Sequence, residues 1–119
     1  VVNAMTNILN KEEYLSTNIP KLICDKNNFL IYMSRLPIPG SKNNEYTKTK
    51  KQVCMYSFPR DKLKKFGNQK NKTPIEKIED IEILRFLELG EKVKMYYVSK
   101  GTIAVDTPQD AHKVSRMLN

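Results

Sequence analysis

The segment from Val105 to Asp110 combines two carboxylates with the start of a helix. Asp106 ends an extended piece of chain, and Thr107 and Pro108 are typical of a helix N-terminus. Ligands bind at the carboxyl ends of strands in open α/β sheets, and a carboxylate there can hold Mg²⁺, which prefers oxygen ligands. In the alternative interpretation, Asp106 or Asp110 only stabilises the helix N-terminus, where negative charge is favourable.

Arg35 is a second residue whose type and position could serve a ligand. It follows an apolar run and precedes Pro37 and Pro39, so a strand is expected to end here. Its guanidinium group can form two parallel hydrogen bonds with a carboxylate or a phosphate. A surface arginine beside a loop is the alternative, and the residues alone leave both open.

Other common catalytic and metal-binding patterns are missing from the sequence. It has no GxSxG, P-loop, GxGxxG or HExxH motif, and His112 is its single histidine. Cys24 and Cys54 lie in apolar runs without a CxxC partner, so buried free thiols are favoured over a zinc site or a disulfide.

The net charge of +8 resides entirely in residues 42–72, which contain nine lysines and one arginine against two acidic residues. Basic surfaces bind nucleic acid by releasing counterions from phosphates, so this segment could bind an anionic polymer. Lysine outnumbers arginine 17 to 4, however, and arginine is the better group for phosphate and base contacts. A solvated loop is therefore favoured, and nucleic acid is not the expected partner.

Apolar patterning and turn residues predict strands and helices in mixed order. Strands are expected at 1–9, 21–25, 29–34, 52–58, 92–98 and 103–105, and helices at 11–15, 59–66, 73–90 and 107–118. This order favours an α/β fold, a mixed sheet with flanking helices, in a single domain spanning 1–119. No window approaches the roughly 20 apolar residues that cross a bilayer. We expect a soluble, cytoplasmic protein without a membrane partner.

The helix expected at 73–90 is the most clearly encoded element. Thr73 caps it, Pro74 occupies the first helical position and Glu76 closes a capping box. Its apolar residues recur at helical spacing: Ile75, Ile78, Ile81, Leu84, Phe86 and Leu87. Four charged residues at intervals of three are typical of a solvated face with local ion pairs: Glu76, Glu79, Glu82 and Arg85.

Taken in order, several segments resemble the later half of CMP-Kdo synthetases: 32–39, 52–56, 73–85, 90–92 and 105–110. The resemblance runs from about Val2 to Leu118. It implies the C-terminal half of a Rossmann-like nucleotidyltransferase fold, which carries the sugar-binding and dimerisation surfaces. The family's N-terminal CTP-binding half, with its triphosphate loop and first metal-holding aspartate, is absent from this sequence.

The resemblance also implies roles for individual residues. Asp106 would be the catalytic, magnesium-holding aspartate, and Arg35 would contact the sugar acid. Gln52, Tyr56 and Glu82 would complete the substrate site, with Glu82 bonding sugar hydroxyls.

Two departures from the family pattern leave the identity of the sugar open. Gln52 stands where the family usually has histidine, and Ile83 stands where it has glutamine. Both family residues lie in the sugar pocket, so Kdo, an amino-substituted Kdo and a nonulosonate all remain candidates.

The resemblance implies a homodimeric enzyme that joins CTP to a sugar acid and releases pyrophosphate, for lipopolysaccharide or other surface-glycan synthesis. The anomeric hydroxyl would attack the α-phosphorus in line, with Mg²⁺ neutralising charge. This chain alone would lack turnover and would dimerise through 29–34, the loop after it and 52–58. The alternative is a non-catalytic assembly module in which residues 42–72 bind nucleic acid or another anionic polymer.

Overall fold

The computed structural model describes residues 1–99, 105 and 107–118 of the chain. Their strands and helices follow one another in this order: β1 (Val2–Asn7), α1 (Lys11–Leu15), β2 (Lys21–Cys24), β3 (Leu30–Ser34), β4 (Lys50–Ser57), α2 (Arg60–Asn68), α3 (Pro74–Glu79), α4 (Ile83–Glu88), β5 (Lys94–Tyr97) and α5 (Pro108–Leu118).

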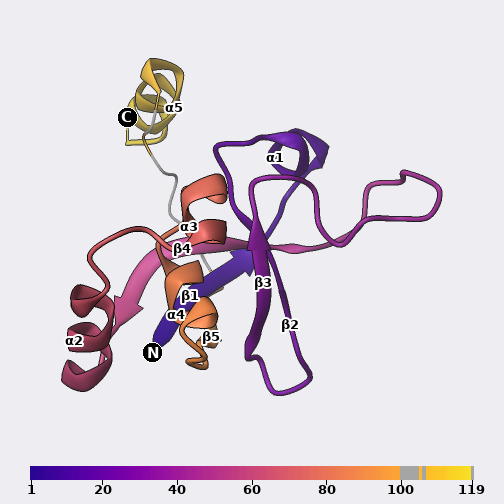
Figure 1. Ribbon diagram of the computed structural model, residues 1–119. Coiled ribbons are helices and arrows are strands. Elements are labelled where there is room, and N and C mark those ends of the chain that lie inside the picture. Colours follow the sequence, from indigo (N-terminus) through magenta and orange to yellow (C-terminus); the bar gives the residue numbers. More distant parts are fainter. Residues whose placement is uncertain (100–104, 106, 119) are drawn as a thin grey trace.

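The described strands form one mixed sheet in the order β3-β2-β4-β1-β5. β1 runs antiparallel to β4 and parallel to β5, and β2 pairs antiparallel with β3 and with β4. Figure 1 shows α3 and α4 lying over the sheet and α5 set apart from it. The expected α/β fold with a mixed sheet and flanking helices is confirmed.

The hydrophobic core lies between the sheet and the segment that contains α4. Its buried members come from four strands, from α4 and from the residues beside these elements: Met5, Leu22, Leu30, Met33, Ile81, Ile83, Leu84, Phe86, Val93 and Met95. This packing fixes α4 against the sheet and so determines where the residue before it, Glu82, is placed.

The prediction of one helix across 73–90 is wrong. The capping box is present, with the Thr73 amide donating to Glu76 Oε2 at 3.0 Å, but α3 ends at Glu79. Asp80 adopts the left-handed conformation, with φ 52° and ψ 50°, and α4 begins three residues later. Because of this break, Ile78 is 84% exposed whereas Ile83 is buried in the core.

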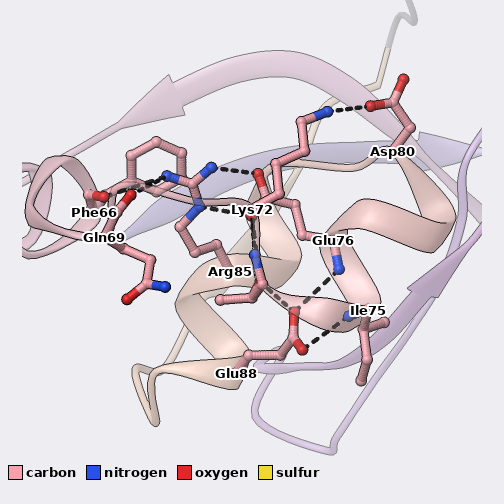
Figure 2. Close-up of polar contacts among 9 residues, drawn as sticks. Phe66, Gln69, Lys72, Ile75, Glu76, Asp80, Arg85 and Glu88 are labelled. Carbon is pink, nitrogen blue, oxygen red and sulfur yellow. Dashed lines mark hydrogen bonds and ion pairs between the residues drawn. The ribbon is translucent and has the colours of Figure 1, made fainter.

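The break turns the predicted solvated stripe into a buried ion pair between α3 and α4. Glu76 is fully buried, and its Oε2 and Oε1 accept hydrogen bonds from Arg85 Nε at 2.6 Å and Nη2 at 2.7 Å. The guanidinium lies 3.8 Å from the ring centre of Phe66 and also donates to the carbonyls of Phe66 in α2 and of Gln69 just after it (Figure 2). Glu88 accepts from the amides of Ile75 and Glu76. These contacts tie α2, α3 and α4 together.

Of the three elements predicted after residue 90, two are confirmed. The helix expected at 107–118 is confirmed as α5, and the strand expected at 92–98 is confirmed as the shorter β5. The strand expected at 103–105 falls mostly outside the described residues. Among the described helices, none has the length and apolar character needed to span a membrane.

Candidate functional site

A hollow of about 240 Å³ opens where β4 meets the break between α3 and α4. Its wall contains Asn18, Pro20, Arg35, Gln52, Cys54, Tyr56, Asp80, Ile81 and Glu82. All four residues predicted to contact the sugar acid, from three separate segments of the chain, therefore line one cavity.

A β-bulge in β4 lies beside the hollow, between Gln52 and Tyr56. The register between β1 and β4 shifts between Asn3 and Ala4, so β4 has extra residues at this point. The side-chain amide of the buried Asn3 donates to the carbonyls of Val53 and Met55 at 2.9 and 3.0 Å. Bulges of this kind re-aim side chains beside functional sites.

Gln52 connects the buried amide of Asn3 with the phenol of Tyr56. Its Nε2 donates to Asn3 Oδ1 at 3.1 Å and to the Tyr56 hydroxyl at 3.2 Å. This arrangement uses both amide hydrogens and leaves the Gln52 carbonyl oxygen for a ligand, while the Tyr56 hydroxyl also contacts the nearby Cys54. Burial, with Cys54 and Glu82 nearby, raises the pKa of Tyr56, so the phenol stays protonated.

The Arg35 guanidinium is held by main-chain carbonyls rather than by a carboxylate. It donates to the carbonyls of Glu79, Thr17 and Asp80 at 2.5, 3.0 and 2.8 Å. Within the described part of the chain it forms no ion pair. The positive charge at the wall of the hollow therefore remains available to an anion.

Glu82 supplies a carboxylate to the same hollow. It lies immediately before α4, is exposed, and makes no side-chain hydrogen bond with the described residues. A free carboxylate accepts hydrogen bonds from hydroxyl groups and repels other anions. Together with Gln52 and Tyr56, it gives the hollow several partners for a polyol.

Two charged residues beside the hollow were missed in the sequence. Lys21 is fully buried and donates to the carbonyls of Ser16, at 2.6 Å, and Arg35. Burial and the nearby Arg35 charge lower its pKa to about 8. Glu79, assigned to a solvated stripe, instead bonds to the end of β3. A charged residue directly after Pro20 at the start of an apolar strand was the available signal for Lys21.

A second, apolar hollow of about 290 Å³ adjoins the first and shares Tyr56 and Glu82 with it. The rest of its wall is Phe58, Leu63, Phe66 and Phe86. Three stacked ring pairs, with centroids 5.2 to 5.5 Å apart, support this wall from β4 to α2.

Ile83 does not line the hollow, although the family residue at its position was predicted to lie in a sugar pocket. It is 2% exposed and packs in the hydrophobic core, whereas its neighbours Ile81 and Glu82 line the hollow. The departure from the family pattern at Ile83 is therefore no evidence about the sugar.

The predicted magnesium ligand, Asp106, lies outside the described residues. Among those that are described, no group of three metal-ligating side chains comes together. The Asp110 carboxylate accepts hydrogen bonds from the amide and hydroxyl of Thr107 at 3.0 and 2.7 Å, which is the capping role considered for it.

The lysines of 42–72 do not form one free basic patch. Four of the nine pair with carboxylates elsewhere, as Lys51–Glu13, Lys62–Glu91, Lys65–Glu91 and Lys72–Asp80. Pairing lowers the charge that an anionic polymer would meet. The two cysteines are free thiols as predicted. The expectation that both would be buried is wrong, since Cys54 is exposed in the hollow and Cys24 is only partly buried.

Comparison with known proteins identifies relatives across nearly the whole chain. No protein-family model matches it. It is 37% identical over 107 residues to the 3-deoxy-manno-octulosonate cytidylyltransferase of Fusobacterium nucleatum subsp. nucleatum, covering 90% of this chain and 43% of the relative. The enzyme of the same description from Acaryochloris marina is 35% identical over 102 residues, covering 86% and 41%.

A solved structure of a CMP:2-keto-3-deoxy-manno-octonic acid synthetase complexed with CTP has the same fold. It superposes with a TM-score of 0.85 and 26% sequence identity over 98% of this chain and 48% of its own. The chain thus spans just under half the length of the proteins it matches, and it is homologous to that part of them. The resemblance to CMP-Kdo synthetases is confirmed.

Proposed function

We propose that the hollow lined by Arg35, Gln52, Tyr56 and Glu82 binds a sugar acid, as part of a cytidylyltransferase that transfers CMP from CTP to that acid. The observation that carries this proposal is the convergence of the four side chains on one cavity of about 240 Å³. Arg35 can donate hydrogen bonds to the carboxylate of the ligand, and the other three side chains can form hydrogen bonds with its hydroxyl groups.

Electrostatics supports a monoanionic, hydroxyl-rich ligand over a neutral one or a polyanion. The Arg35 guanidinium and the Glu82 carboxylate both line the hollow, and the buried Lys21 cation lies beside Arg35. A carboxylate beside Arg35 gains a charge-assisted hydrogen bond, which is about twice as strong as a neutral one. A second anionic group near Glu82 would be repelled.

The complete reaction belongs to a protein of the relatives' length. Attack of the anomeric hydroxyl on the α-phosphorus of CTP forms the sugar–phosphate bond and expels pyrophosphate. In this scheme the described residues bind and orient the acid. When bound, Mg²⁺ would stabilise the charge that develops on the phosphate oxygens, with Asp106 proposed to help hold it.

Titration calorimetry with 3-deoxy-manno-octulosonate tests the proposal directly. Binding should weaken about tenfold in Glu82→Gln, because the amide accepts hydroxyl hydrogen bonds less well than a carboxylate. Glu12→Gln is the matched control, since Glu12 is an exposed carboxylate on α1 outside the hollow. Equal affinity in both variants, or no binding by the parent chain, would refute the proposal.

Thiol modification gives an independent readout of the same site. Cys54 is exposed within the hollow, whereas burial raises the pKa of Cys24 and should slow its reaction. A bound sugar acid should therefore protect Cys54 selectively from a maleimide. Comparing Kdo, its amino-substituted form and a nonulosonate by this protection would rank the three candidate ligands. Protection by none of them would count against the site.

A further inference from the structure

The carboxylate of Glu79 is hydrogen-bonded to the end of β3 and to Arg35, the residue that follows it. Its Oε1 accepts hydrogen bonds from the Tyr32 hydroxyl at 3.0 Å and the Ser34 hydroxyl at 2.6 Å. Its Oε2 accepts from the Arg35 amide at 2.9 Å. One side chain at the end of α3 thus binds three donors along and just after β3, from Tyr32, Ser34 and Arg35.

The main chain at the same helix end holds the Arg35 side chain. The carbonyls of Glu79 and Asp80 accept from Nε and Nη2, and the carbonyl of Thr17 accepts from Nη1. Three of the five guanidinium N–H groups are used in this way, and two have no partner among the residues that the structure describes. Both ends of Arg35, amide and guanidinium, therefore depend on the position of Glu79.

The Glu79 carboxylate forms no direct ion pair with the guanidinium that it helps to place. It bonds to the Arg35 amide and to two hydroxyls, and not to the guanidinium. Burial alone would raise its pKa, but the hydrogen bonds from Ser34, Arg35 and Tyr32 outweigh burial and lower the pKa. A direct ion pair with the guanidinium would compete with an incoming carboxylate, and this geometry avoids that competition.

We propose that Glu79 is a positioning residue, which pre-orders Arg35 to receive the carboxylate of a sugar acid without touching the ligand. Glu79 is not part of the wall of the hollow. An arginine that is already ordered loses less side-chain entropy when it binds, so ordering raises affinity for the group it contacts. This inference rests on the proposed function, because it assigns the ligand's carboxylate to Arg35.

The test compares Glu79→Gln and the milder Tyr32→Phe with Val93→Ala, a core truncation away from Arg35 that lowers stability without altering the site. The first measurement needs no ligand. It is the rate at which the Arg35 Nε–H exchanges with solvent, monitored by NMR. The second is the preference for 3-deoxy-manno-octulosonate over its uncharged carboxamide, measured by calorimetry. In Glu79→Gln we expect about tenfold faster exchange and a preference reduced about tenfold, with a smaller change in Tyr32→Phe and none in Val93→Ala.

The outcomes separate this inference from the proposed function. Unchanged Arg35 exchange in Glu79→Gln would overturn the positioning role. Faster exchange with an unchanged acid preference, or the same loss of preference in Val93→Ala, would reduce Glu79 to a structural residue and also overturn it. Failure of the parent chain to bind the acid would overturn the proposed function itself, and with it any role of Glu79 toward that ligand.

Discussion

The carboxylate of Glu76 and the guanidinium of Arg85 meet at two points, with Oε2 2.6 Å from Nε and Oε1 2.7 Å from Nη2. Glu76 is fully buried, and Arg85 lies between it and the ring of Phe66 (Figure 2). This pair joins the two helices on either side of the break at Asp80, and so it supports the wall that Asp80 and Glu82 contribute to the hollow.

Arg85→Met should therefore strongly destabilise the fold, since it leaves the Glu76 carboxylate buried without its cation. We expect a loss of about 3 to 5 kcal/mol in the free energy of unfolding, measured by urea denaturation. Lys72→Met is the control, because it breaks the exposed Lys72–Asp80 pair and should change stability little. If the two variants lose equal stability, the buried pair does not have this role.

Stability should rise as the pH passes through about 8, because the pKa of Lys21 falls from 10.5 to about 8 on folding. Between these values the unfolded chain binds a proton that the folded chain has released, so raising the pH favours folding by about 1 kcal/mol per unit. Below about 8 the charged Lys21 is buried at a cost.

Urea unfolding of the parent chain and of Lys21→Met, from about pH 7 to about pH 9.5, isolates this contribution. Burial raises the pKa values of Cys24 and Tyr32, and both groups oppose the trend at alkaline pH. Their effects are common to the two proteins and cancel in the difference. Parallel stability curves for the two proteins would show that Lys21 titrates normally.

Asp80 has a left-handed backbone conformation, so replacing it with glycine should destabilise the fold less than replacing it with alanine. Its φ of 52° is costly for a residue with a Cβ, and aspartate offsets part of that cost through local hydrogen bonding. Asp80→Gly and Asp80→Ala both lose the pair with Lys72, so the comparison between them isolates the backbone. The alanine variant should have a folding equilibrium constant roughly fivefold smaller, measured by urea denaturation. Equal stability of the two variants would argue against strain at this position.

The helix break at Asp80 could not be predicted from the sequence, whereas the start of α3 could. The start of α3 follows from local rules, because Thr73, Pro74 and Glu76 satisfy the first turn of a helix by themselves. The break at Asp80 does not, because the sequence continues at helical spacing through it. What selects the break is tertiary: Ile83 enters the core and Arg85 reaches the buried Glu76 only after the chain turns.

The candidate site was predictable only in part for a similar reason. Arg35, Gln52, Tyr56 and Glu82 were identified by resemblance, and the structure adds that one hollow contains them. Glu79 binds Tyr32, 47 positions away in the sequence, and Lys21 binds the main chain of Arg35, 14 positions away. Charge spacing along one segment carries no information about such partners.

A homodimer should form through β3, the loop after it and β4, and its surface residues give the reason. Ile31, Leu36 and Met55 are 56%, 64% and 59% exposed. β3 is the end strand of the sheet, and beyond the hydrogen bond of Leu30 to Val93 its outer edge pairs with none of the described strands. Exposed apolar groups beside an open strand edge are typical of an interface. Sedimentation equilibrium at micromolar concentration should therefore give a mass near twice 13.8 kDa.

Ile31→Lys should weaken this dimer at least about tenfold, because association would bury an unpaired ammonium group at the apolar centre of the contact. Ile78→Lys is the matched control: Ile78 is 84% exposed on α3, outside the predicted interface, so the same change should leave the dissociation constant unaltered. Circular dichroism and urea denaturation would establish that both variants fold. A single species of 13.8 kDa at every concentration, or equal weakening by the two substitutions, would show that these strands do not form the interface.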